Sequence, residues 1–194
     1  ILEGATEADS KVFDLLIKNR SAIEKTVAPA AVNAKIEKAC AATVKKAIEY
    51  KDENLLNEAK AKMKAHFPDH AAAFAQDADL RYNAATHNSK KYLSAMKTRQ
   101  KAIGNNAARL HDLCVEMVRA FPTDTKVLKQ AEKWASTAAK NGGLPEYYLT
   151  LGDIYKRLGN KDKARQAAEE ARKALGDKDT LNMGQKIDYF LQSL

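Results

Sequence analysis

Apolar residues recur every three to four positions along most of the 194-residue chain, which is the periodicity of an α-helix with one buried face. No run alternates between apolar and polar residues as a half-buried strand would. Capping residues, prolines and glycines mark helix starts near residues 53, 70, 89, 106, 124, 145, 161 and 179. This pattern predicts an all-α fold, an α-α superhelix of about ten helices that pack in pairs.

The helical pattern of the N-terminal part is clearest from Pro29 to about Tyr50. Its apolar positions recur at steps of four; they are Val32, Ile36, Cys40, Val44 and Ile48. Before this helix, Asp9 or Ser10 can cap a shorter one, because their side-chain oxygens accept hydrogen bonds from free backbone N–H groups. Residues 1–9 carry no periodic stripe. We therefore predict a linker at residues 1–9 and a helical repeat domain at residues 10–194.

Two helices and a turn can be read in detail between residues 145 and 176. On the first helix, the residues at offsets i, i+3, i+4 and i+7 share one face; they are Tyr148, Leu151, Gly152 and Tyr155. After a break at Gly159 and Asn160, small side chains recur on the second helix, at Ala164, Ala168 and Ala171. Gly152 and Ala164 leave room for two backbones to approach, so we predict that these faces pack as a helical hairpin.

This stretch closely resembles the tetratricopeptide signature, in which an aromatic residue, a Leu-Gly pair and a second aromatic residue precede an Ala-rich helix. Three positions depart from the signature: Tyr148 replaces the usual Trp, Ala168 the usual Phe, and Gly176 the usual Pro. The resemblance implies neighbouring helix pairs of the same kind, because one pair cannot bury its apolar face alone. It also implies that the chain binds other proteins rather than performing catalysis.

The last segment, residues 179–194, has an amphipathic helical pattern. Its apolar face consists of Leu181, Gly184, Ile187, Leu191 and Leu194. A helical array needs an end helix to cover its last apolar face. We therefore predict a capping helix at residues 179–194.

A second resemblance covers residues 105–176, which are similar to the C-terminal helical region of thioredoxin-like proteins of Bacteroidetes-type bacteria. It implies a redox domain upstream of Ile1, an accessory role for this chain, and a periplasmic or exported location. The start at Ile1 rather than Met also indicates a processed protein or a piece of a longer one. The resemblance is carried by the run from Lys126 to Ala135, by Tyr147 and Tyr148, by residues 158–161 and by the Ala-rich helix that follows.

Residues capable of chemistry occur only in isolation. His66 and His70 are four apart, but Pro68 lies between them and disrupts the helix that would align them on a metal. Cys40 and Cys114 form no CxxC pair and fall on apolar stripes, where a buried and inert thiol is expected. No phosphate-binding loop, Rossmann glycine pattern or nucleophile elbow occurs. We expect this chain to be no enzyme and to bind no cofactor or metal.

Positive charge is concentrated between residues 80 and 111, where seven basic residues and no acidic residue occur in a chain of formal net charge +8. On the predicted helix at residues 89–103, a candidate basic patch of Lys90, Lys97 and Lys101 lines one face. This face could meet phosphates or an acidic partner, or it could simply be solvated. Only 8 of the 33 basic residues are Arg, and base recognition favours Arg. Sequence-specific nucleic-acid binding is therefore not expected.

The tetratricopeptide resemblance also implies a groove lined by the first helix of each pair. The candidate partner groove consists of Glu146, Leu149, Asp153 and Lys156, which lie off the packing stripe. Asp153 would repel a carboxylate, so we expect a mixed, modestly apolar surface without an anion clamp. Its partner would be a protein or peptide, or a domain of the chain's own full-length protein. The alternative is that this face is merely solvated.

We therefore predict a non-catalytic protein-interaction or scaffold module, the accessory helical region of a thioredoxin-like protein. The alternative from another class is an electrostatic binder of nucleic acid or of an anionic surface through residues 80–111. No apolar run approaches the ~20 residues that a membrane span needs, so no span is expected.

Overall fold

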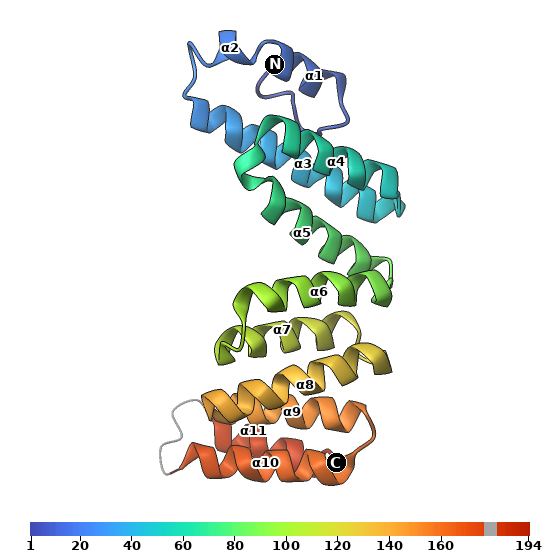
Figure 1. The fold of residues 1–194 in the computed structure, drawn as a ribbon, viewed down its shortest axis with the longest axis vertical. Helices are drawn as coiled ribbons and strands as arrows, with labels where there is room; N and C mark the ends of the chain where they lie inside the picture. The colour runs from blue at the N-terminus through green and yellow to red at the C-terminus, as the bar shows by residue number, and fades with distance from the viewer. Residues whose placement is uncertain (177–181) are drawn as a thin grey trace. The chain divides into compact units, whose positions relative to one another are not determined.

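The computed structural model describes residues 1–176 and 182–194 (Figure 1). The chain divides into two compact units, Ile1–Asn88 (unit 1) and Ser89–Leu194 (unit 2). Within the described residues it forms eleven helices and no strand, which confirms the all-α prediction. Unit 1 holds α1 (Lys11–Lys18), α2 (Arg20–Ile23), α3 (Pro29–Tyr50), α4 (Glu53–His66) and α5 (Pro68–Ala85). Unit 2 holds α6 (Ser89–Ile103), α7 (Ala107–Ala120), α8 (Thr125–Gly142), α9 (Pro145–Arg157), α10 (Lys161–Leu175) and α11 (Met183–Gln192).

The helix boundaries follow from local chemistry. The side chain of Ser10 accepts a hydrogen bond from the backbone N–H of Phe13, and Asp52 and Asp124 cap α4 and α8 in the same way. Gly143 adopts a left-handed conformation with φ of 64° and ends α8, because glycine takes this conformation without steric cost. α5 begins at residue 68, two residues before the predicted start, because proline is favoured in the first helical turn.

In unit 1, consecutive helices pack on one another, α3 on α4 and α4 on α5. The predicted stripe of α3 forms the centre of the unit: Val32, Ile36, Cys40 and Val44 are buried. α1 closes one end of this core through Phe13 and Leu16, which are fully buried. The four-residue helix α2 was not predicted, because one turn is too short to show a periodic stripe.

Residues 1–10, the N-terminal segment, lie on α3 instead of forming a free linker. Ala5 and Ala8 are fully buried in the unit 1 core. The N–H of Ala8 donates to Thr43 Oγ1 at 2.8 Å, and Lys62 Nζ of α4 donates to the Ala8 carbonyl oxygen at 2.5 Å. The segment has no helical periodicity because tertiary contacts, not helix formation, bury its alanines.

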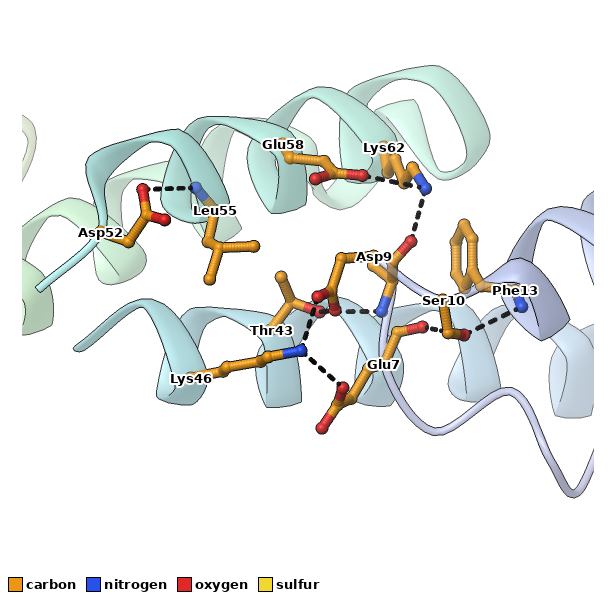
Figure 2. Close-up of polar contacts among 11 residues, drawn as sticks. Glu7, Asp9, Ser10, Phe13, Thr43, Lys46, Asp52, Leu55, Glu58 and Lys62 are labelled. Atoms are coloured by element: carbon orange, nitrogen blue, oxygen red, sulfur yellow. Dashed lines mark hydrogen bonds and ion pairs between the residues drawn. The ribbon is translucent and has the colours of Figure 1, made fainter. Parts of the chain in front are cut away.

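Two carboxylates of the N-terminal segment pair with Lys46 of α3 (Figure 2). Lys46 Nζ lies 2.7 Å from Asp9 Oδ2 and 3.1 Å from Glu7 Oε2, and Thr43 Oγ1 donates to Asp9 Oδ1 at 3.1 Å. Burial alone would raise the pKa of Asp9, but the hydrogen bonds from Lys46 and Thr43 outweigh it and lower the pKa. The segment is therefore held by small apolar side chains together with ionised carboxylates.

In unit 2, each helix from α7 to α11 packs on the next, and α7 also contacts α9. α11 packs on α9 and α10, with Met183 and Ile187 buried against Ala168 and Ala171. This is the position expected of the predicted end helix. The predicted start of that helix at residue 179, and its residue Leu181, lie outside the described residues.

Gly152 is buried where α9 meets its neighbours. A Cβ atom there would lie 3.1 Å from the ring of Phe190 on α11 and 3.4 Å from the Ala164 carbonyl oxygen on α10. The small residue thus allows a close approach of α10, as predicted, and also receives an aromatic ring from α11. α9 buries a second face through Tyr147 and Ile154, which the predicted stripe did not include.

Candidate functional site

A groove runs between α7 and α9 in unit 2, with a volume of about 510 Å³. Because α8 runs back between them in the sequence, α7 and α9 point in the same direction (Figure 1). The groove is lined by Val115, Val118, Arg119, Pro122, Leu149, Thr150, Asp153 and Arg157. We refer to it as the α7/α9 groove.

Two polar contacts tie the α7 and α9 sides of the groove together, one toward each end. Toward the start of the helices, His111 Nε2 lies 3.0 Å from Thr150 Oγ1, within hydrogen-bonding distance. At the other end, Arg157 Nη1 donates to the Pro122 carbonyl oxygen at 3.4 Å. These contacts fix the register of the two helices, so that Val115 and Arg119 of α7 face the middle and the far end of α9.

The floor of the groove is apolar and open to solvent. The side chain of Val115 is 36% exposed, which is unusual for a large apolar residue of this chain. Val118 and Leu149 are half-buried beside it. Leu149 also packs against the cluster formed by α10 and α11. Of these three apolar side chains, that of Val115 is therefore the least buried by packing within unit 2.

The charges of the groove are separated along its length. At the Pro122 end, Arg157 Nε lies 2.7 Å from Asp153 Oδ2, so the carboxylate of Asp153 is neutralised within α9. Arg119 is exposed and makes no ion pair or hydrogen bond with any residue that the structure describes. This end therefore carries one unmatched positive charge.

Two carboxylates, those of Asp112 and Glu146, lie near His111 beyond the opposite end of the groove. Burial lowers the pKa of His111, while the nearby carboxylates of Asp112 and Glu146 act in the opposite direction without reversing the shift. The imidazole is consequently neutral at pH 7, and it stacks at a tilt on the ring of Tyr147 with centroids 4.6 Å apart. The α7/α9 groove thus has two carboxylates beyond one end and an unmatched arginine at the other, with an apolar floor between them.

The structure separates the four predicted groove residues. Leu149 and Asp153 line the groove, and Glu146 lies one turn before them, beyond one end of the groove. Lys156 points elsewhere: its ammonium donates to Ser193 Oγ at 2.8 Å and lies 5.8 Å from the centre of the Phe190 ring. The reason is its spacing of four from Gly152, which places it on the face that packs against α11.

The α7 side of the groove was missed because only residues of α9 were considered at the sequence level. Val115 and Arg119 lie four apart on α7, off the buried stripe that includes Cys114 and Met117. An apolar residue outside a helix's buried stripe was the signal that could have identified this face. The charge argument also changes, because Arg157 neutralises Asp153 and thereby removes the reason given against an anionic ligand.

The candidate basic patch lies on α6. Lys90, Lys97 and Lys101 are exposed, while Tyr92 and Met96 on the other face are buried. Within the wider window of residues 80–111, Arg81 pairs with Asp77 and Arg99 with Glu116. The window is also divided between unit 1 and unit 2 at residue 88. The three lysines of the candidate basic patch all lie on one helix of unit 2.

The remaining chemical candidates are buried or dispersed. Cys40 and Cys114 are free and buried, and burial raises the pKa of the Cys40 thiol to about 11 and that of Cys114 to about 12. His66 ends α4 and His70 lies on α5, where its ring stacks on Phe67. In the part of the chain that the structure describes, no three His, Cys, Asp or Glu side chains are grouped as a metal site would require.

No protein-family model, curated protein or solved structure matches the chain. The resemblances to tetratricopeptide repeats and to thioredoxin-linked helical regions therefore stay predictions based on the motifs described above. None of the described helices combines the length and apolar character needed to cross a membrane.

Proposed function

We propose that the chain is a protein-interaction module and that unit 2 binds an extended peptide segment of a partner in the α7/α9 groove. The observation that carries this proposal is the exposed apolar floor around Val115, bounded by opposite charges at its two ends. Its volume lies in the range of ligand-binding pockets. Because Val115 and Arg119 are exposed, the groove suits a chain segment that lies along the surface.

The partner in this proposal is another protein or a further domain of the same full-length protein. The tetratricopeptide resemblance of residues 145–176 supports a role in binding, since such helix pairs present grooves to peptides. The thioredoxin-linked resemblance supports an accessory role beside a redox domain and an exported location. Neither the peptide-binding role nor the accessory role assigns catalysis, a metal or a cofactor to the residues of this chain.

A second candidate is electrostatic binding of an anionic surface or nucleic acid by α6. It is favoured by one observation, the exposure of Lys90, Lys97 and Lys101 without an ion pair to any described residue. Affinity for a single-stranded oligonucleotide would then collapse between roughly 50 and 200 mM salt, and replacing the three lysines by Gln would abolish it. Unchanged binding by that variant would exclude α6 as the site.

The groove proposal is tested with the whole chain and a library of random twelve-residue peptides displayed on phage. Peptides enriched on the wild type are then measured on two variants, Val115→Gln and the control Tyr189→Gln. Tyr189 lies on α11 and is 76% exposed, so the control also replaces an exposed apolar side chain. We expect Val115→Gln to weaken binding by roughly tenfold, the effect of one lost contact of about 1.4 kcal/mol.

The control variant should bind as the wild type does, and both variants should keep the wild-type melting temperature because the two side chains are exposed. Failure to enrich any peptide would overturn the proposal. Equal affinities of Val115→Gln and wild type would place the binding surface outside the α7/α9 groove.

A further inference from the structure

We infer that the α7/α9 groove reads an acidic side chain two residues away from an apolar one in its partner. This inference rests on the proposed function and specifies its ligand chemistry. The apolar side chain would pack on Val115, Val118 and Leu149, and the carboxylate would pair with Arg119. The argument has three steps: the charges, the spacing and a precedent within unit 1.

The first step concerns charge complementarity at the Pro122 end. Arg157 is held by Asp153 and by the Pro122 carbonyl oxygen, so both groups of that ion pair already have partners. Arg119 has none among the described residues, and it stands beside the apolar floor. A carboxylate from a ligand would complete this end. The same carboxylate would be repelled at the other end by Asp112 and Glu146, so the acid has one preferred position.

The second step concerns spacing. Val115 and Arg119 are four residues apart on α7, so their side chains are neighbours separated by about 5–6 Å along one helix face. In an extended peptide, side chains two residues apart point to the same side and lie roughly 6.6 Å apart. One apolar residue and one acidic residue with a single residue between them therefore match Val115 and Arg119 together.

The third step is that unit 1 already uses this pairing of apolar and acidic groups to hold a non-helical segment on two helices. In the N-terminal segment, the buried Ala8 is followed directly by Asp9, and Glu7 precedes it (Figure 2). Asp9 and Glu7 pair with Lys46, and Thr43 holds the backbone between them. Helical surfaces of this chain therefore hold apolar side chains together with carboxylates, and the two-residue spacing rests on the second step alone.

The test selects the same random peptide library on four forms of the whole chain: wild type, Arg119→Gln, Arg119→Glu and the control Arg165→Gln. Arg165 lies on α10, is exposed and makes no ion pair with a described residue, which matches Arg119. Wild type and control should enrich Asp or Glu two positions from an apolar residue at least threefold over the input library. Arg119→Gln should lose this enrichment but keep the apolar preference. Arg119→Glu should enrich Lys or Arg at that position.

The outcomes separate this inference from the proposed function. If all four forms select the same apolar peptides without an acidic preference, the inference on Arg119 is overturned while the groove function stands. If peptides selected on the wild type depend on neither Val115 nor Arg119, both fall. An acidic preference of the wild type that weakens in 200 mM salt would further support a direct ion pair.

Discussion

Both units contain a helical surface with apolar side chains and basic residues; this surface is covered in unit 1 and exposed in unit 2. In unit 1, the N-terminal segment and α1 cover the face of α3 and α4 and give carboxylate partners to Lys46 and Lys62. In unit 2, the face of α7 and α9 has no such cover, and Arg119 stays unmatched among the described residues. The first surface contributes to stability because its apolar groups are buried. The second leaves apolar area exposed, which is typical of a surface that binds a partner.

The comparison also shows how little separates a structural contact from the binding site that we propose. Both surfaces combine small or branched apolar side chains with cations at the edge. The difference is whether the chain itself supplies the segment that lies on them. Three predictions, ordered from the largest expected effect to the smallest, test this contrast.

The largest effect is expected from removing the main anchor of the covered surface. Phe13 of α1 is fully buried against the apolar stripe of α3. Phe13→Ala should therefore lower the free energy of unfolding of unit 1 by about 3–5 kcal/mol. The thiol of Cys40 lies in the same cluster and can report opening, because a buried thiol of raised pKa reacts slowly. Labelling of Cys40, followed by mass spectrometry across a denaturant series, measures the effect.

Cys114 is the internal control for this measurement, since it lies in unit 2 while Phe13 lies in unit 1. Its labelling should change much less than that of Cys40. Wild-type labelling of Cys40 in the Phe13→Ala protein would show that the cover does not protect the unit 1 core.

A smaller effect is expected from filling the notch at Gly152 in unit 2. Gly152→Leu places a side chain against Phe190 and the Ala164 carbonyl oxygen, so it should cost about 1–3 kcal/mol through overpacking. Fluorescence of Trp134, the single tryptophan, reports denaturant unfolding from within α8 of unit 2. Gly152→Ala is the graded control and should cost less. An unchanged midpoint for Gly152→Leu would mean that α11 does not pack as described.

The smallest effect is expected from the carboxylate that fastens the N-terminal segment. The pKa of Asp9 is lowered in the folded chain, so its contribution to stability is complete above the unfolded value of about 3.9 and is lost as the pH falls through the folded value. Asp9→Asn should therefore be less stable than wild type at pH 7. The difference should shrink below about pH 4, where the wild-type carboxyl becomes neutral as well.

Denaturant unfolding followed by circular dichroism at pH 3, 4, 5 and 7 measures both proteins under matched conditions. Glu3→Gln is a suitable control, because Glu3 is exposed and its carboxylate makes no ion pair within the described residues. A stability difference between wild type and Asp9→Asn that is the same at all four pH values would contradict the ion-pair role of Asp9.

Local signals in the sequence determine most of the fold. Asp52, Asp124 and Gly143 act where the sequence places them, because helix caps depend on a few neighbouring residues. The packing of residues 1–9 could not be predicted in this way, since Ala5 and Ala8 become buried only once α3 exists. For the same reason, nothing in the sequence pattern shows that Phe190 reaches Gly152.

Of the candidate site residues, Leu149 and Asp153 lie off the packing stripe and line the α7/α9 groove, and their role in binding a partner stays a prediction. Lys156 was assigned to the same face, but its side chain contacts the end of α11. A contact between residues more than thirty positions apart cannot be predicted from local spacing. Arg119 was not identified as a candidate site residue. It lacks an acidic partner because Arg157 already pairs with Asp153, and only the folded chain shows this ion pair.

The two contacts that join the sides of the α7/α9 groove determine which of its positions can be substituted without moving the helices. The His111–Thr150 and Arg157–Pro122 contacts set the register of the helices from outside the apolar floor. Positions 115 and 119 can therefore accept new side chains while the helices keep their places. If the groove binds peptides as we propose, engineered libraries that differ only at these positions would share one backbone and recognise different peptides, so new specificities would arise without a loss of folding.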